Sequence, residues 1–302
     1  MRYLLLIFSL LLFGKVLAQE EESFEESATP EFEYNSYYMA KSNLLDVKTL
    51  DLKKNEADNF LSNPLDFPNL ENLVIHFSRV SKIKDLKNTK LSSIRIMYSW
   101  QLNTLPNNFN QYSKLKKIEV YNCSLTELPS SIFNNKVISD ICLCNNKISG
   151  FPKISENNSI RKLSLDLNNL KKLPSDFFNL KNLEVLTLKH CNIEEFPEVV
   201  LNLKNIKVLD LGYNPITKLP SQLAKMRQLE ELYIPKTNIK KLPTSFRNSN
   251  LKYLMIDGVR LSDKEKEKLK SSLPKNCKVQ WGNSANYQVE LGCACLIENA
   301  RF

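Results

Sequence analysis

The sequence predicts an α/β-type solenoid, in which short parallel strands line a concave face and return segments form the convex side. Three observations lead to this fold class. One leucine-rich phrase recurs ten times from Val47 onward, at intervals of 21 to 24 residues. Apolar and polar residues alternate within the phrase, as in a strand with one buried face. A Leu-Pro or Phe-Pro pair follows in seven of the units, where the chain must turn away from the sheet.

The phrase reads L-x-x-L-x-L-x-x-N-x-L-x-x-L-P, and "IKVLDLGYNPITKLP" from Ile206 is one example. Its fourth and sixth positions are expected to point into the core, and its third, fifth and seventh to point out of the concave face. One unit buries about six apolar side chains, worth roughly 9–18 kcal/mol, against about 1–2 kcal/mol of ordering cost for each of its residues. No unit is therefore expected to fold alone. The units begin at Val47, Leu70, Leu91, Leu115, Ile138, Ile160, Leu183, Ile206, Leu229 and Leu251.

Over residues 47–281 this pattern resembles the leucine-rich repeat family. The Leu-Pro pair is similar to that of the subclass found in Ras-pathway scaffolds, erbin-like proteins and many secreted bacterial repeat proteins. The resemblance implies a horseshoe-shaped leucine-rich repeat solenoid of about ten repeats, with a parallel sheet on its concave face. It also implies a binding surface and no catalytic activity.

The termini differ from the repeats in composition. Residues 1–18 combine Arg2 with an apolar run that is too short to span a bilayer, which predicts a signal peptide. An uncleaved anchor is the alternative, and Lys15 disfavours it. Residues 19–46 are expected to form an acidic, disordered arm and an N-terminal cap, because seven glutamates and no basic residue occupy 19–33. The predicted location is secreted, or periplasmic and cell-surface.

The repeats are assigned to residues 47–260 and a C-terminal cap to residues 261–282. Ser262 is expected to cap a helix, and "CKVQW" from Cys277 to form a last edge strand. Residues 283–302 do not fit the repeat and receive no structural prediction. In an oxidising compartment Cys277 could pair with Cys293 or Cys295.

Cysteines divide by their place in the repeat. Cys123 and Cys191 take the ninth position, where an Asn side chain otherwise bonds to the backbone, so they are expected to be inward and structural. Val259 breaks this ladder near its end. Cys142 and Cys144, at the fifth and seventh positions, are expected to be accessible on the concave face. Their spacing of about 6.6 Å disfavours a mutual disulfide, and the absence of a nearby histidine disfavours a metal site.

The sequence offers no candidate catalytic residues. His76 and His190 lie five units apart, about 24 Å along a sheet, so they cannot share a site. The six glycines form no nucleotide-binding loop, and no nucleophile motif occurs. We therefore expect no enzyme, no cofactor and no metal.

Two aromatic clusters on the concave face are the predicted partner-binding sites. Large side chains on a rigid sheet provide contact area at low entropic cost, although some could merely pack against their neighbours. The first cluster contains His76, Met97, Tyr98 and Tyr121, beside Val74 and Phe77; the second contains Tyr213, Tyr233, Tyr253 and Met255. The primary prediction is a protein ligand bound by the concave sheet.

The charge distribution supports an alternative partner. Removing Arg2, Lys15 and the seven glutamates from the net charge of +9 leaves +14 on residues 34–302. An acidic glycan or another polyanion could bind lysines beside the Leu-Pro positions, whereas secretion and the lack of a recognition motif disfavour nucleic acid. These lysines are Lys171, Lys172, Lys218, Lys240 and Lys241.

Overall fold

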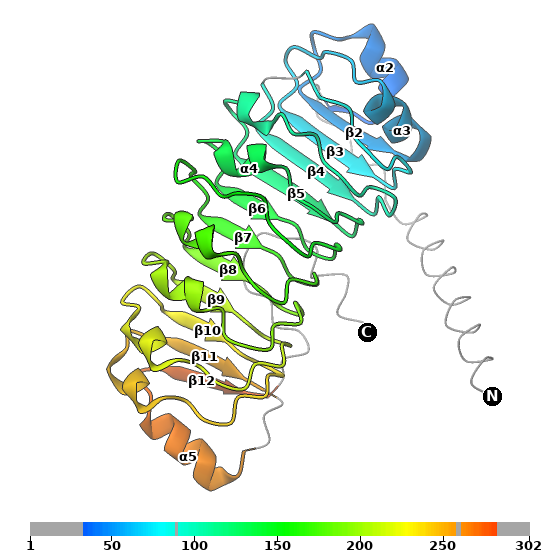
Figure 1. The fold of residues 1–302 in the computed structure, drawn as a ribbon. Helices are drawn as coiled ribbons and strands as arrows, with labels where there is room; N and C mark the ends of the chain where they lie inside the picture. The colour runs from blue at the N-terminus through cyan, green and yellow to red at the C-terminus, as the bar shows by residue number, and fades with distance from the viewer. Residues whose placement is uncertain (1–32, 88–89, 258–260, 283–302) are drawn as a thin grey trace, which may run out of the picture.

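A computed structural model describes residues 33–87, 90–257 and 261–282. Twelve parallel strands follow one another in chain order in one curved sheet, which lines the concave side of the solenoid (Figure 1). The sheet and its return segments confirm the predicted leucine-rich repeat architecture. The predicted signal peptide (1–18), most of the acidic arm, Val259, Cys293 and Cys295 lie outside the described residues.

Each of the ten predicted units supplies one strand, which begins at its third residue. Two further strands, β1 and β12, close the ends of the sheet. Neighbouring units keep their register, with Leu50 beside Leu73 and Leu52 beside Ile75. The strands are β1 (Glu33–Tyr34), β2 (Thr49–Lys53), β3 (Asn72–His76), β4 (Ser93–Met97), β5 (Lys117–Tyr121), β6 (Asp140–Cys142), β7 (Lys162–Ser164), β8 (Val185–Thr187), β9 (Val208–Asp210), β10 (Glu231–Tyr233), β11 (Tyr253–Ile256) and β12 (Lys278–Trp281).

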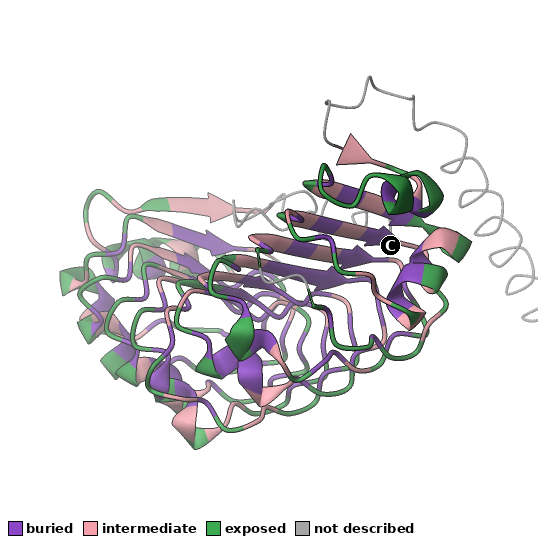
Figure 2. Cartoon of the chain, turned by 90° about the horizontal axis from the view of Figure 1, so that it is seen from above, coloured by how far each residue is buried: buried purple, intermediate pink, exposed green. Residues whose placement is uncertain are grey.

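The core lies between the sheet and the return segments. Leucines and isoleucines at the fourth and sixth positions are fully buried, which gives the strands the banded burial seen in Figure 2. Phe109, Phe133, Phe177 and Phe246 fill the convex side of this core. The inward columns were correctly predicted from the alternation of the phrase.

The convex side consists of short helical turns (Figure 1). Five of them begin directly after the proline of the Leu-Pro or Phe-Pro pair, for example Pro174 and Pro220. Proline donates no backbone hydrogen bond, so it is compatible with leaving the sheet and entering a turn. The turns are η1 (Phe109–Gln111), α4 (Ser130–Asn134), η2 (Ser175–Asn179), η3 (Glu198–Asn202), η4 (Ser221–Lys225) and η5 (Thr244–Asn248).

The N-terminal end carries two helices, α2 (Tyr37–Ser42) and α3 (Lys54–Ser62), that the sequence pattern did not locate. Tyr37 packs edge-on against Phe60, with 5.7 Å between ring centroids. The hydroxyl of Ser36 donates to Glu56 at 3.0 Å, which ties α3 to the segment before it. These contacts cover the first leucines of the core.

The C-terminal elements follow the prediction more closely. Ser262 and Glu265 form a reciprocal capping box at the start of α5 (Asp263–Ser271). The edge strand β12 pairs with β11, as expected from "CKVQW". Cys277 is a free thiol, so its suggested pairing with Cys293 or Cys295 is wrong. Within the described ranges, none of the helices has the length and apolar character needed to cross a membrane.

Candidate functional site

Much of the predicted partner-binding surface is buried. Met97 and Tyr121 retain 7% and 4% exposure, and they pack with Cys142 and Cys144. The expectation that Cys142 and Cys144 are accessible is therefore wrong. Parallel strands repeat about every 4.8 Å, so outward side chains in the same column contact one another.

The second predicted cluster behaves in the same way. Tyr233 and Met255 lie side by side on β10 and β11 and are 9% and 3% exposed. The Tyr233 hydroxyl donates a hydrogen bond of 2.6 Å to Glu231, and burial raises the pKa of this phenol. The expectation that Met97, Tyr121, Tyr233 and Met255 are exposed anchors is thus wrong, because each is covered by its neighbours.

Four predicted site residues keep accessible surface. Tyr98, Tyr213 and Tyr253 are partly exposed, and so is His76, whose Nε2 lies 3.1 Å from Asp51 Oδ1. Tyr253 stays in contact with Tyr233, at 5.3 Å between ring centroids. Neither Tyr98 nor Tyr213 belongs to a strand: Tyr98 directly follows β4, and Tyr213 lies three residues after the end of β9.

These two tyrosines belong to a row of residues, here called the strand-end row, that occupy the eighth position of their units. The row takes left-handed backbone angles, with φ between 49° and 56°. Asparagine and glycine tolerate this conformation, whereas bulkier residues are strained in it. The row consists of Lys54, Phe77, Tyr98, Asn122, Asn145, Leu167, His190, Tyr213 and Lys236.

Aromatic rings in the strand-end row form two stacks. Phe77 stacks on Tyr98 with 5.2 Å between ring centroids, and Trp100 meets Tyr98 edge-on at 5.9 Å. Farther along the solenoid, His190 stacks on Tyr213 at 4.2 Å. Trp100 is 51% exposed. The outward columns did not identify Trp100 because it follows its strand by three residues.

A cavity of about 350 Å³ opens at the first stack. Its walls combine aromatic rings with cationic side chains. The lining residues are Lys54, Phe77, Ser78, Arg79, Tyr98, Trp100 and Gln101. Arg79 is exposed, and its backbone N–H donates to Asp58 at 2.7 Å, which fixes the backbone of this loop.

The buried ladder beneath the row holds these turns in place. The amide of Asn146 donates to the carbonyl oxygens of Val120, Leu143 and Cys144 at 2.8–3.1 Å. Cys191 takes the same position and donates through its thiol to the Leu165 carbonyl at 3.2 Å. Cys123 does likewise toward the Tyr121 carbonyl, and burial raises the pKa of its thiol to about 12. The predicted structural role of Cys123 and Cys191 is confirmed.

Polar side chains occupy the middle of the concave face. Glu119 is 2% exposed and accepts from Arg95 at 2.8 Å and from Lys117 at 3.1 Å. Asp166 is fully buried, and its Oδ1 accepts from the Lys189 backbone at 2.8 Å. Burial raises the pKa of Asp166, and its Oδ2 has no hydrogen-bond partner among the described residues. Cys142 is disulfide-bonded, while its Sγ lies 3.5 Å from that of Cys144.

Known proteins share this repeat architecture. Residues 140–280 match the family described as leucine-rich repeat region. This match supports a leucine-rich repeat family for that part of the chain. A chain in the octameric complex of Latrophilin 3, Unc5D and the leucine-rich repeat part of FLRT2 has a similar fold, with a TM-score of 0.60 and 18% identity over 85% of this chain and 84% of that one. A leucine-rich repeat protein of Leptospira interrogans gives a TM-score of 0.47 and 17% identity, over 83% of this chain and 100% of that one.

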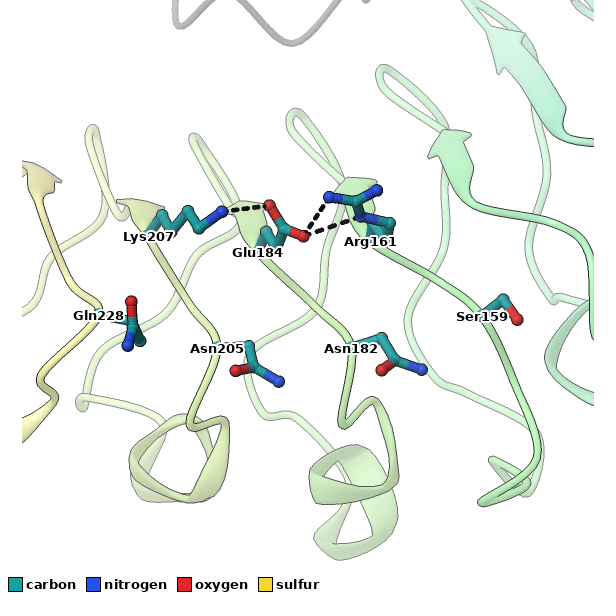
Figure 3. A pocket seen from close by; sticks show the side chains of 7 residues that line it. All are labelled: Ser159, Arg161, Asn182, Glu184, Asn205, Lys207 and Gln228. Atoms are coloured by element: carbon teal, nitrogen blue, oxygen red, sulfur yellow. Dashed lines mark hydrogen bonds and ion pairs between the residues drawn. The ribbon is translucent and has the colours of Figure 1, made fainter.

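Ion pairing differs between the side of the sheet where the strands begin, here called the strand-start edge, and the side where they end, here called the strand-end edge. At the strand-start edge, Glu184 lies between Arg161 and Lys207 and bonds to both at 2.8 Å (Figure 3). These cations lower the pKa of Glu184. A trough of about 430 Å³ opens here, with Asn182 and Asn205 on its wall.

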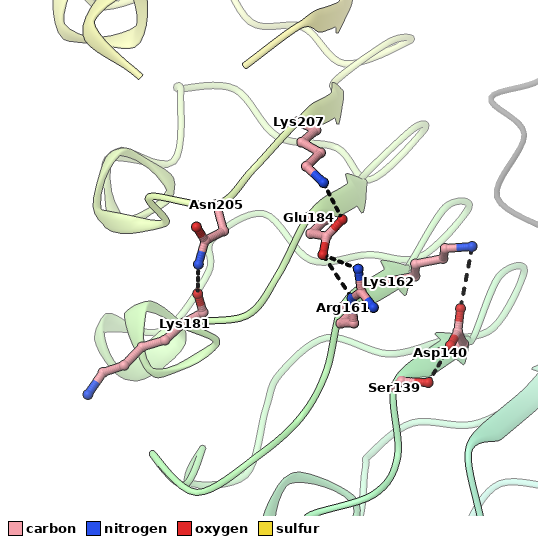
Figure 4. A network of polar contacts seen from close by, with 8 residues as sticks. All are labelled: Ser139, Asp140, Arg161, Lys162, Lys181, Glu184, Asn205 and Lys207. Atoms are coloured by element: carbon pink, nitrogen blue, oxygen red, sulfur yellow. Dashed lines mark hydrogen bonds and ion pairs between the residues drawn. The ribbon is translucent and has the colours of Figure 1, made fainter. Parts of the chain in front are cut away.

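Adjacent repeats extend this paired network. Lys162 lies 3.6 Å from Asp140, and the Asn205 side chain donates to the Lys181 carbonyl at 2.8 Å (Figure 4). The trough therefore presents mostly neutralised charge. Near the strand-end edge, Lys171, Lys172, Lys218, Lys240 and Lys241 are exposed, and the ion pairs between described residues include none of them.

Proposed function

We propose that this chain is a secreted, non-catalytic leucine-rich repeat scaffold that binds another protein through the strand-end side of its concave surface. The observation that best supports this proposal is the stacking of aromatic rings at positions of the strand-end row that have left-handed backbone angles. The expected signal peptide over residues 1–18 supports the extracellular location. FLRT2, whose leucine-rich repeat part occurs in a complex with Latrophilin 3 and Unc5D, is a precedent for protein binding by this architecture.

Backbone strain supports a functional reason for these rings. A bulky residue with positive φ costs about 1–2 kcal/mol. The same solenoid places asparagine at Asn122 and Asn145, where the strain is smaller. Aromatic residues at Tyr98 and Tyr213 therefore make the fold less stable than asparagine would. A role of these rings in binding would explain why they occur at strained positions.

The cavity beside Trp100 indicates which kind of partner side chain would bind there. Aromatic walls of Phe77, Tyr98 and Trp100 suit an apolar side chain of the partner, and burying them contributes strongly to affinity. The exposed guanidinium of Arg79 favours an acidic residue beside that anchor. Protein binding at this site requires no cofactor.

The test is a quantitative pull-down from the native cell envelope and medium, followed by affinity measurement with the purified partner. A Tyr98→Ala, Trp100→Ala variant removes the first stack. The matched control is Phe178→Ala, which removes an exposed aromatic ring from the η2 turn on the convex side. We expect the control to retain the partner and the double variant to lose at least about tenfold in affinity. Equal affinity of both folded variants would contradict the proposed surface.

Binding of an acidic glycan is the second candidate. The exposed lysines near the strand-end edge, which take part in no described ion pair, favour it. A sulfated polysaccharide column developed with salt provides the test. Lys240→Ala, Lys241→Ala should elute at lower salt than the wild-type chain, whereas Lys207→Ala, which removes a paired lysine, should elute near it. Identical elution of all three proteins would exclude this candidate.

A further inference from the structure

Two parallel rows of side chains line the trough at the strand-start edge (Figure 3). The first row, here called the amide row, holds the residue directly before each repeat unit. The second row, here called the ionic row, holds the second residue of each unit. Within each row the members follow one another at intervals of 23 residues. The amide row consists of Ser159, Asn182, Asn205 and Gln228, and the ionic row of Arg161, Glu184 and Lys207.

The asparagines of the amide row are held in place by the backbone of the preceding unit. The Asn182 side chain donates to the Asn158 carbonyl at 3.1 Å. The Asn205 side chain donates to the Lys181 carbonyl at 2.8 Å (Figure 4). Each amide uses one N–H in this way, and its Oδ1 accepts no hydrogen bond from the described residues. The amides therefore present an oxygen and a second N–H that a ligand can bind without first ordering the side chains.

The ionic row carries little net charge. Glu184 accepts from Arg161 and from Lys207, each at 2.8 Å, and its side chain is 23% exposed. Because an ionised carboxylate offers about four lone-pair sites, Glu184 can accept further hydrogen bonds while both ion pairs persist. Two cations and one anion leave a single positive charge on the trough, which disfavours a polyanion.

We propose that the trough binds a neutral, hydroxyl-rich glycan chain that runs along the solenoid between the two rows. A hydroxyl group both donates and accepts, so it matches the oxygen and the N–H of Asn182 and Asn205. Glu184 would accept from further hydroxyls, and Arg161 and Lys207 would donate to them. The trough lies at the edge opposite the strand-end row, so this binding goes beyond the proposed protein binding and does not depend on it.

The spacing of the repeats favours a glycan over a peptide. Neighbouring units lie about 4.8 Å apart, whereas two residues of an extended peptide advance about 6.6 Å. A peptide running along the solenoid would lose register with the amide row after one or two units. A sugar ring with its glycosidic oxygen is similar in length to one unit spacing, so an extended glycan can present one ring to each unit. The four members of the amide row span about 14 Å, the length of a short oligosaccharide.

The lining also disfavours nucleic acid. None of the described residues on the wall of the trough is aromatic, so nucleobases have no ring to stack on. The single net positive charge could neutralise few phosphates. Hydrogen bonding to neutral hydroxyl groups is the recognition chemistry that the amide and ionic rows provide.

Calorimetric titration of the full-length chain with cellohexaose, mannohexaose and chitohexaose tests the class of ligand. At least one of these neutral oligosaccharides should bind. Its affinity should be similar at low and high salt, because an uncharged ligand makes no ion pair that salt can screen. Failure of all three to bind, or an affinity that falls steeply with salt, would overturn the proposal.

The triple variant Asn182→Ser, Asn205→Ser, Gln228→Ala tests the place of binding. Serine can keep the bond to the preceding unit, since the Ser159 hydroxyl donates to the Lys136 carbonyl at 2.6 Å. The variant therefore removes the outward amide groups while retaining that support. We expect its affinity for the bound oligosaccharide to fall at least about tenfold. Unchanged affinity of the folded triple variant would overturn the proposal.

Asn69→Ser is the matched control. Asn69 also directly precedes a repeat unit and donates to the Leu45 carbonyl at 2.8 Å, but it lies outside the trough. The control should bind the oligosaccharide like the wild-type chain, and an equal loss in the control would contradict binding in the trough. The Tyr98→Ala, Trp100→Ala variant should also keep wild-type affinity for the oligosaccharide. Failure of the protein-binding proposal would leave these titrations unchanged, so the two proposals fail separately.

Discussion

The imidazole of His190 stacks on the ring of Tyr213, with 4.2 Å between ring centroids and 24° between ring planes. Burial, aided by the positive charge of Lys189, lowers the pKa of His190. NMR titration should therefore give a midpoint below the usual value of about 6.5. The folded state disfavours protonation, so the contribution of this residue to stability is complete above the unfolded-state pKa. It is lost as the pH falls through the lower, folded-state pKa.

The His190→Gln variant separates this effect from general acid denaturation. Glutamine does not titrate, so the variant should lose stability less steeply than the wild-type chain as the pH falls below about 6.5. A His190 midpoint at or above the usual value would show that the stack does not favour the neutral imidazole.

The Asn ladder should be the most sensitive polar element of the core. Asn168 donates to the Leu143 and Leu165 carbonyls at 2.9 and 2.8 Å and accepts from the Ile148 N–H at 3.0 Å. Asn168→Ala leaves these buried groups unpaired, and urea unfolding should show a loss of about 3 kcal/mol. Asn168→Cys should cost less, because a thiol serves this position at Cys191.

The neighbouring Asn169 is exposed and provides the control for that series. Asn169→Ala should change the free energy of unfolding by less than about 0.5 kcal/mol. If Asn168→Ala were equally mild, the ladder hydrogen bonds would contribute little to stability.

Two glutamates with similar partners should differ in energetic importance. Glu119 is 2% exposed between Arg95 and Lys117, so Glu119→Gln should cost about 2 kcal/mol. Glu184 bridges Arg161 and Lys207 at the more open strand-start edge, where Glu184→Gln should cost less than about 1 kcal/mol. Chemical denaturation at low and high salt checks both values, and a reversed order would contradict the burial argument.

The capping box of α5 provides a local stability test. Ser262→Ala removes the side-chain acceptor for the Glu265 N–H and should destabilise the C-terminal end by about 1 kcal/mol. Hydrogen exchange should report faster opening of α5 than in the wild-type chain. Ser262→Asp keeps a capping oxygen and should stay close to wild type; similar exchange in the alanine variant would indicate that packing alone holds this helix.

The repeat phrase determined the backbone architecture because its period and alternation are local properties of the chain. Each unit buries Leu or Ile at fixed positions, so the phrase located ten strands, the inward columns and the ladder roles of Cys123 and Cys191. The helix cap at Ser262 was also predictable from the sequence, because a capping box, here Ser262 with Glu265, spans only four residues. Helix α2 precedes the first repeat unit and α3 lies within that unit, and the repeat phrase predicted neither helix.

Only the tertiary structure decided which outward side chains remain accessible. Met97 and Tyr121 come from units that are 24 residues apart in the sequence, yet strand pairing places them side by side and buries both. The same stacking leaves Tyr98 and Trp100 open at the strand ends. The sequence by itself determined the solenoid, because local alternation specifies which way each strand residue points. Exposure depends on contacts between units, so only the folded structure separated the buried outward columns from the strand-end row.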